Sequence, residues 1–282
     1  MILTETPQER AFNQAHGGNP CREQPCGARF ALWPSTIIAD PSGNRALIFY
    51  NLISAAPGNF NFHELGNSVA IWLNFADQPQ RPTINPPVVA DHPDLLFSAN
   101  EPNFGSAALM KQGTLYVYGC GSVGLGKECK LGRVNPANVL DRNAWTFFAG
   151  NGDWSTQVGD AVSVFGGDDI LNVSWNQFLQ RYVAVYSQPL SENVMLRTSP
   201  NPEGPWSGEI KAFTAMRPAP RRHECPRRAG ASRIQCRWRT RDVRQLLAFH
   251  RDLLKRSPDC VARTETSQRA AVIRPAIAPD KY

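Results

Sequence analysis

The chain has 282 residues, which is enough for one large domain or two small ones and for a substantial buried core. It holds 23 prolines and 21 glycines, and a tenth of its residues are aromatic, a composition that favours an all-β protein over a helical one. No run of eighteen apolar residues is present, so the sequence predicts no membrane-spanning segment.

The net charge of +6 averages two unlike parts of the chain. Residues 1–216 carry 13 Lys and Arg against 18 Asp and Glu, whereas residues 217–282 carry 17 against 6. The body is therefore mildly acidic, and the basic character lies in the tail. We predict a separate basic tail at 217–282.

Three units of similar plan are predicted between residues 30 and 207, each an alternation of short strands and tight turns. The expected strands are 36–39, 46–50 and 68–73 in the first unit, 106–110, 114–118, 130–134 and 145–148 in the second, and 161–165, 170–175, 182–187 and 194–198 in the third. The expected first strands of the three units begin at residues 36, 106 and 161, which are 70 and 55 residues apart. Repeats of this length with about four strands each are typical of propeller blades. A β-sandwich gives no reason for the repeated order.

The third unit ends in a corner whose prolines and glycine restrict the backbone, Ser199-Pro-Asn-Pro-Glu-Gly-Pro-Trp206. Trp206 is expected to pack there as a large apolar cap. Three blades do not close a ring, so an incomplete propeller leaves two sheet edges unpaired.

Seven cysteines are many for a reducing compartment. Cys21 and Cys26 frame a short loop and Cys120 and Cys129 a Gly-rich one, so we predict two local disulfides, with free buried cysteines as the alternative. Neither pair has the two-residue gap of a zinc knuckle, and we predict no metal site and no cofactor. The first residues lack the basic end and apolar core of a secretory signal.

The tail holds 15 arginines, against 9 in the 216 residues before it. A nucleic-acid surface is one interpretation, but the arginines follow no helical stripe and are not interleaved with aromatic residues. In the alternative reading frame, Gln235 to Arg251 can encode NADGGRVMYVSYSRSTG, a turn followed by an alternating strand. We therefore interpret residues 217–282 as out-of-frame sequence that is irregular or partly helical, with one helix at 241–255.

The body resembles a bacterial, mostly extracytoplasmic family, domain of unknown function 4185, over about residues 21–213. The motifs that carry the likeness are ALWPS (31–35), EPNFGSAAL (101–109), KLGRV (130–134), VLDRNAWTFFAG (139–150), GDAVSVF (159–165), VSWN (173–176) and the Gly-Pro-Trp corner. The resemblance implies a five-bladed, glycosidase-like β-propeller, with blades over 30–216 after a truncated N-terminal segment at 1–29, and some relatives are endo-acting D-arabinanases. It also implies an acidic Gly-Asp-Thr type motif in a preceding first blade, and its absence here counts against catalysis.

Glycoside hydrolysis needs two carboxyl groups across the scissile bond. Glu101 and Asp160 precede the expected first strands of the second and third units, so both are predicted to face the axial funnel, within roughly 5–10 Å of each other. The alternative is that each carboxylate binds backbone N–H groups in its turn. Trp33, His63, Trp175 and Asn176 are the candidate sugar contacts, with blade-core packing as the alternative for at least one tryptophan.

These observations predict a monomeric, carbohydrate-active propeller, an endo-acting glycosidase if active, that acts on or binds an extracellular polysaccharide. A non-catalytic carbohydrate- or surface-binding propeller is the alternative. No nucleic-acid partner is expected, and the family resemblance implies a secreted or periplasmic location.

Overall fold

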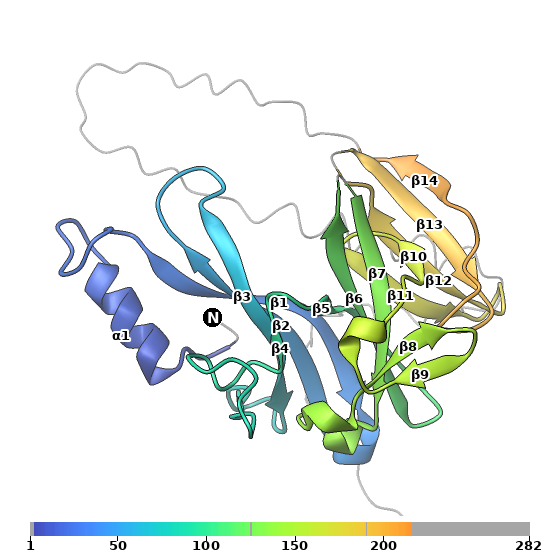
Figure 1. Cartoon of the computed structure of the whole chain (residues 1–282), viewed down its shortest axis with the longest axis horizontal. Coiled ribbons are helices and arrows are strands. Elements are labelled where there is room, and N and C mark those ends of the chain that lie inside the picture. Colours follow the sequence, from blue (N-terminus) through green and yellow to red (C-terminus); the bar gives the residue numbers. More distant parts are fainter. Residues whose placement is uncertain (1–2, 125, 190, 216–282) are drawn as a thin grey trace, which may run out of the picture. The chain divides into compact units, whose positions relative to one another are not determined.

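The computed structural model describes residues 3–124, 126–189 and 191–215, all within the first of the two units into which the chain divides, Met1–Arg221. Three antiparallel sheets follow one another along this part of the chain, in blue, green and yellow to orange in Figure 1. The predicted tail, including the helix at 241–255, lies outside the described residues.

Each sheet is a meander in which neighbouring strands in sequence pair with each other. The first sheet contains β1 (Arg29–Asp40), β2 (Arg45–Ala55), β3 (Phe62–Trp72) and β4 (Phe97–Ser98). The second contains β5 (Asn103–Lys111), β6 (Thr114–Val123), β7 (Gly126–Val134), β8 (Thr146–Gly150) and β9 (Asp153–Ser155), with β10 (Phe165–Gly166) paired to β7. The third contains β11 (Leu171–Asn176), β12 (Arg181–Ser187), β13 (Asn193–Ser199) and β14 (Ile210–Thr214). The predicted class, an all-β and incomplete propeller-like fold, is confirmed.

Helical segments within the described ranges are short. They are the α-helix α1 (Pro7–His16) and the 3-10 turns η1 (Pro41–Gly43), η2 (Pro136–Asn138), η3 (Arg142–Ala144) and η4 (Val158–Asp160). None of the described helices is long and apolar enough to cross a membrane.

Apolar side chains between successive sheets form the core. Phe49 and Val69 of the first sheet pack with Phe104, Val117 and others of the second. A further cluster joins the second sheet to the third, and its members include Leu109, Tyr118, Leu131, Val173, Tyr182 and Ala184. Burying side chains of this size contributes about 1.5–3 kcal/mol each. The middle sheet is therefore covered on both faces, as an internal blade of a propeller is.

Gly105 of the second sheet lies close to Phe49 of the first. Its φ is +127°, and a Cβ atom there would lie 2.6 Å from Cβ of Phe49. Only glycine fits this position, because a side chain would be strained by the backbone conformation and would overlap Phe49. This glycine explains part of the EPNFGSAAL motif.

The N-terminal segment carries an element that the sequence prediction omitted. Thr6 and Glu9 form a capping box that begins α1. Phe12 contacts Phe30 of β1 at 4.5 Å between ring centroids, and Leu3 is buried against the first sheet. Residues 3–29 are thus part of the folded body.

The third predicted unit begins too early in the chain. Residues 161–165 were expected to be its first strand, but Val162 N donates to Phe148 O, Val164 N donates to Cys129 O, and Phe165 pairs with Cys129. The segment therefore runs along the second sheet, and the third sheet starts at β11. The expected first strand of the first unit, 36–39, is the end of the longer β1.

The Gly-Pro-Trp corner forms as predicted. Trp206 packs on Phe165 with 4.8 Å between ring centroids, and its Nε1 donates to Pro202 O at 3.1 Å. Tyr118 Oη of β6 donates to the same carbonyl at 2.7 Å. The corner therefore attaches the third sheet to the second.

Candidate functional site

A pocket of about 480 Å³ lies at the end of the body where the first strands of the second and third sheets begin. Glu64 comes from β3, residues 99–103 from the turn that leads into β5, and Asp169 from the loop before β11. The β6–β7 hairpin supplies the remaining wall, with residues 120–123, Lys127, Glu128 and Lys130. All three sheets or their connections thus contribute to one site.

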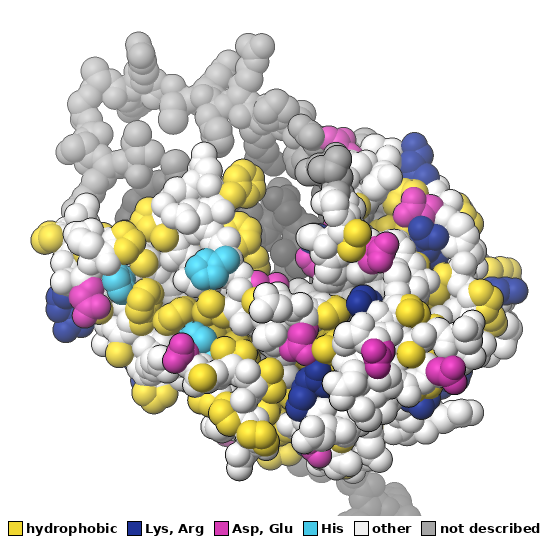
Figure 2. Space-filling view, in the orientation of Figure 1, with side chains coloured by type: hydrophobic (Ala, Val, Ile, Leu, Met, Phe, Trp, Pro, Cys, Tyr) yellow, Lys and Arg dark blue, Asp and Glu magenta, His cyan; other side chains and the backbone are white. Residues whose placement is uncertain are grey.

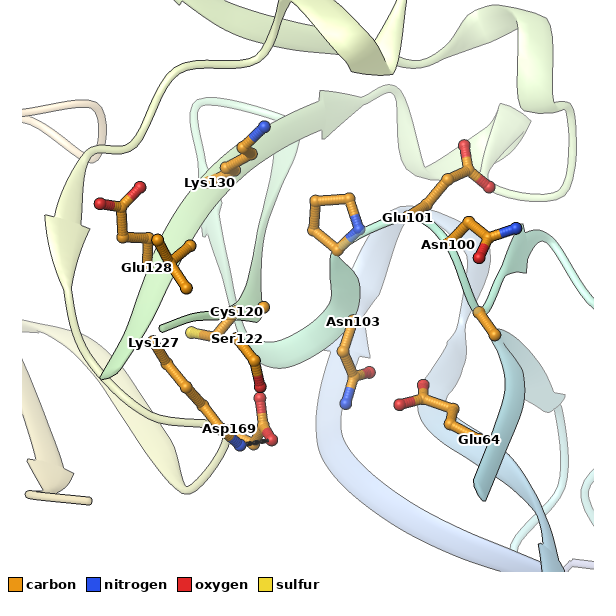
Figure 3. A pocket seen from close by; sticks show the side chains of 14 residues that line it. Glu64, Asn100, Glu101, Asn103, Cys120, Ser122, Lys127, Glu128, Lys130 and Asp169 are labelled. Carbon is orange, nitrogen blue, oxygen red and sulfur yellow. Dashed lines mark hydrogen bonds and ion pairs between the residues drawn. The ribbon is translucent and has the colours of Figure 1, made fainter. Parts of the chain in front are cut away.

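The acidic side chains of the pocket point in different directions. Figure 3 shows Glu64, Asn103, Ser122 and Asp169 directing their polar groups toward one another, whereas Glu101 and Glu128 turn their carboxylates away. Glu64 and Asp169 are therefore the two carboxyl groups that face the same space.

Glu64 is held in a partly dehydrated position. Burial raises the pKa of its carboxyl group, and the negative charge of Asp169 raises this pKa further. Asn67 and the ammonium group of Lys127 act in the opposite direction. No hydrogen bond satisfies Oε1 of Glu64, although this atom is buried. The environment therefore favours a protonated Glu64 at a higher pH than an exposed glutamate would allow.

Asp169 is anchored by a cation. Lys127 on β7 forms ion pairs with Asp169 and, at 3.3 Å, with Asp168. These carboxylates raise the pKa of Lys127 even though its burial acts to lower it. Oδ1 of Asp169 is buried and has no hydrogen-bond partner. One oxygen of this carboxylate is thus fixed, and the other is left for a ligand or water.

Glu101 has a different environment from Glu64. Its Oε2 accepts hydrogen bonds from Ser98 N at 2.8 Å and Ser98 Oγ at 3.2 Å, and its Oε1 pairs with Arg142 at 2.7 Å. These contacts close the turn between β4 and β5. The carboxylate is therefore engaged in holding the rim of the pocket.

Unpartnered polar atoms gather around the same site. Buried side-chain atoms without a hydrogen bond occur on three residues that line the pocket, Glu64, Asn103 and Asp169, and on Asn67 and Asn51, which lie on the same face of the first sheet as Glu64. An unmade hydrogen bond of a buried group costs about 1–3 kcal/mol, so such atoms are uncommon in folded proteins. Their concentration here indicates a site that binds polar groups or water.

The arrangement suits proton transfer. One carboxyl group is biased toward its protonated form, and a nearby one is paired with a cation, which is the division of roles that acid–base hydrolysis requires. No cluster of three or more His, Cys, Asp or Glu side chains suited to a metal ion occurs in the parts of the chain that the structure describes.

The structure separates the two predicted catalytic residues. Glu101 lines the pocket, whereas Asp160 is exposed in η4 and accepts a hydrogen bond from Ser155 Oγ at 2.5 Å. The predicted place of Asp160 before a first strand is wrong, because the third sheet begins at β11. A catalytic role for either residue stays a prediction.

The predicted sugar contacts also lie apart from one another. His63 neighbours Glu64 on β3 but projects to the other face of the sheet, since successive side chains of a strand alternate. Trp175 and Asn176 end β11, away from Asp169, and Asn176 Oδ1 accepts from Leu179 N in a turn. Trp33 lies on β1 and contacts Phe62.

Both predicted disulfides form. Cys21 pairs with Cys26, and Cys120 pairs with Cys129 directly across β6 and β7. Cys120 also lines the pocket. The second disulfide therefore fixes the hairpin that carries Lys127.

Neither Glu64 nor Asp169 is among the candidate site residues taken from the sequence. A signal for Asp169 exists: it precedes β11 by the same two positions by which Glu101 precedes β5. Glu64 carries no such signal, because its burial comes from residues distant in sequence.

Charges of both signs are interspersed on the face shown in Figure 2, with exposed hydrophobic side chains among them. This distribution differs from the continuous basic surface that nucleic-acid binding uses.

Two solved structures are similar to this chain. One is a presumptive hydrolase from Bacteroides ovatus ATCC 8483, with a TM-score of 0.46 and 14% identity over 66% of this chain and 46% of that one. The other is a glycosyl hydrolase from Bacteroides ovatus, with a TM-score of 0.36 and 10% identity over 64% of this chain and 51% of that one. The chain thus spans about half the length of these proteins.

No curated protein matches the chain significantly. The family described as Domain of unknown function (DUF4185) matches residues 67–231, a range that includes the turn before β5, the β6–β7 hairpin and Asp169. The match covers more than half of the sequence, and the chain belongs to the DUF4185 family.

Proposed function

We propose that the pocket binds a polysaccharide and hydrolyses a glycosidic bond, with Glu64 as the acid and Asp169 as the base. The observation that carries this proposal is the pairing of a dehydrated carboxyl group, whose pKa is raised, with a nearby carboxylate held by Lys127. The similar solved structures are too distant to support it.

In the proposed reaction Glu64 donates its proton to the glycosidic oxygen as the bond from the sugar carbon to that oxygen breaks. Asp169 accepts a proton from the water whose oxygen forms the new bond to the sugar carbon. After the products leave, Glu64 regains a proton and Asp169 loses one, so the only substrate consumed besides the glycan is water. Lys127 positions Asp169, and Glu101 with Arg142 holds the rim.

The direct test is a reducing-end assay with arabinan, xylan, levan and polygalacturonate. Activity on at least one of these should fall about 10²–10⁴-fold in both Glu64→Gln and Asp169→Asn. Asp153→Asn, an exposed aspartate on β9 that does not line the pocket, is the matched control. Activity should decline as the pH rises through the pKa of Glu64, because the acid must be protonated.

Asp160→Asn separates this proposal from the prediction based on the sequence. If that variant is inactive while Glu64→Gln retains activity, the assignment of the acid to Glu64 is wrong. If the unmodified chain hydrolyses none of the four polysaccharides but binds one, the protein is better described as a non-catalytic carbohydrate-binding module. The half-exposed side chains of Trp33 and Phe62 favour this second candidate.

We also place this activity outside the cytoplasm. Two disulfides within one small body are typical of an oxidising compartment.

A further inference from the structure

Trp33 and Phe62 form an exposed aromatic platform on the first sheet. Each side chain is 47% exposed, and the ring centroids lie 5.3 Å apart with the planes tilted by 56°. Neighbouring large apolar side chains that remain half exposed frequently mark a ligand-binding surface. Aromatic faces of this kind pack well against the C–H faces of sugar rings.

The platform and the pocket are connected by side chains on one face of the first sheet. Phe62 and Glu64 are two residues apart on β3, in a regular stretch of its pairing with β2, so their side chains project from the same face. Trp33 is directly opposite Asn51 of β2, and Asn51 is directly opposite Asn67 of β3. A row of side chains therefore leads across the sheet from the exposed indole to buried amides beside Glu64.

The polar groups of this row select the chemistry of the ligand. Oδ1 of Asn51, Oδ1 of Asn67 and Oε1 of Glu64 are buried acceptors without partners, and Nδ2 of Asn67 is a buried donor without one. A sugar hydroxyl group both donates and accepts, so it can pair with atoms of either kind, whereas an ionised carboxylate or sulfate group only accepts and leaves the three oxygens unpaired. Lys127 is already paired with Asp168 and Asp169, so it offers little compensation for an added negative charge.

We propose that the pocket takes an extended, neutral glycan, with one ring stacked on the Trp33–Phe62 platform and a neighbouring part of the chain on Asn51, Asn67 and Glu64. This inference deepens the proposed function and rests on it for the identity of the reacting site. Its ligand is a polymer, because the platform and the pocket are separate contacts that one sugar ring does not fill.

Binding can be measured without hydrolysis in a Glu64→Gln background. The probes are arabinan, xylan and levan as neutral polysaccharides and polygalacturonate as the acidic one, each included in a native gel through which the full chain migrates. At least one neutral polymer should retard the protein. Trp33→Ala and Phe62→Ala should each weaken this retardation about tenfold in apparent dissociation constant. Residues 217–282 carry 17 Lys and Arg against 6 Asp and Glu and attract a polyanion, so retardation by polygalacturonate should be the same in the parent and in both variants.

Phe75→Ala is the matched control. Phe75 is 73% exposed and contacts Trp72, which ends β3 at the opposite end from Phe62. Retardation should persist in this variant. Circular dichroism should show that all variants remain folded, since none of the replaced rings is buried.

Three results would overturn the inference: no retardation by any neutral polymer, equal retardation of the parent and the Trp33→Ala and Phe62→Ala variants by such a polymer, or retardation by polygalacturonate that these two variants lose. The proposed function fails separately, when Glu64→Gln retains full hydrolysis. Loss of platform binding with retained hydrolysis of short oligosaccharides would support both statements.

Discussion

Two groups of charged residues in the body use similar components in opposite ways. Beneath α1, Arg81 bonds to both carboxylate oxygens of Glu9 and to Oδ2 of Asp94, which also accepts from Tyr50. The Glu9 and Arg81 side chains are 1% and 3% exposed, and only Nε of Arg81 lacks a partner in this group as the structure describes it. This α1 cluster is closed, and it joins the N-terminal helix to the first sheet.

The pocket cluster of Glu64, Lys127 and Asp169 is open. Its cation is also paired, but Oε1 of Glu64 and Oδ1 of Asp169 remain buried without hydrogen bonds. In a closed cluster the polar groups bond to one another and stabilise the fold, whereas in an open cluster some acceptor atoms stay available to a molecule from solution. Charge and burial are common to both clusters, and the pocket cluster differs in that its carboxylate oxygens remain without hydrogen bonds.

The largest effect is expected from breaking the closed cluster. Arg81→Met leaves Glu9 and Asp94 buried without a cation, so it should lower the free energy of unfolding by about 3–5 kcal/mol. Urea denaturation followed by tryptophan fluorescence measures the change. Arg181→Met, which replaces an exposed arginine on β12, is the control. A loss below 1 kcal/mol in Arg81→Met would contradict the interpretation of a closed cluster.

The same replacement in the pocket cluster should have a smaller effect on stability. Lys127 is 26% exposed and Asp169 38%, so water can replace part of the ion pair, and Lys127→Met should cost about 1 kcal/mol or less. It should also raise the pKa of Glu64, because the ammonium charge is one of the influences that lower it. NMR titration of the ¹³C-labelled Glu64 carboxyl group measures this shift. An unchanged or lowered pKa of Glu64 would show that the charge of Lys127 does not act on this carboxyl group.

The smallest effect is a gain in stability from Glu64→Gln. A carboxyl group whose pKa is raised on folding binds its proton more tightly in the folded chain, so its contribution to stability is present at low pH and is lost as the pH rises through the folded pKa. Gln cannot ionise and avoids this loss. The melting temperature should therefore rise by about 1–2 °C at pH 7 and should equal that of the parent at pH 4.

Asp153→Asn is the control for that comparison, because Asp153 is exposed on β9 and no pocket contact involves it. A gain that is the same at pH 4 and pH 7 would show that replacing Glu64 acts through packing and not through ionisation.

The hairpins of this fold were predictable because local chemistry determines them. Gln112 and Gly113, both with positive φ, form the turn between β5 and β6 that the sequence indicated. Residues 161–165 alternate as a strand does, and they are extended, but alternation specifies only a half-buried segment and not the sheet to which it belongs. Their attachment to β7 depends on contacts with residues distant in sequence.

The site was less predictable for the same reason. Placing acidic residues before the first strand of each unit found Glu101, and with the correct start of the third sheet it would also have found Asp169. Glu64 becomes chemically distinctive only through burial and the nearby charge of Asp169, more than a hundred positions later. Such a pair is visible only in three dimensions.

Arg142 connects the rim of the pocket to the core. Its guanidinium carbon lies 4.8 Å from the ring centre of Phe97 and 4.9 Å from that of Phe147, two fully buried rings, while its Nη2 binds Glu101. A ligand that restrains Glu101 at the rim therefore also restrains Arg142 and these aromatic rings. Binding in the pocket should thus raise the melting temperature of the whole body. At a hundredfold excess over its dissociation constant, a ligand adds about 2.7 kcal/mol to stability. The heat resistance of the fold can thus report which sugars enter the pocket before any reaction is known.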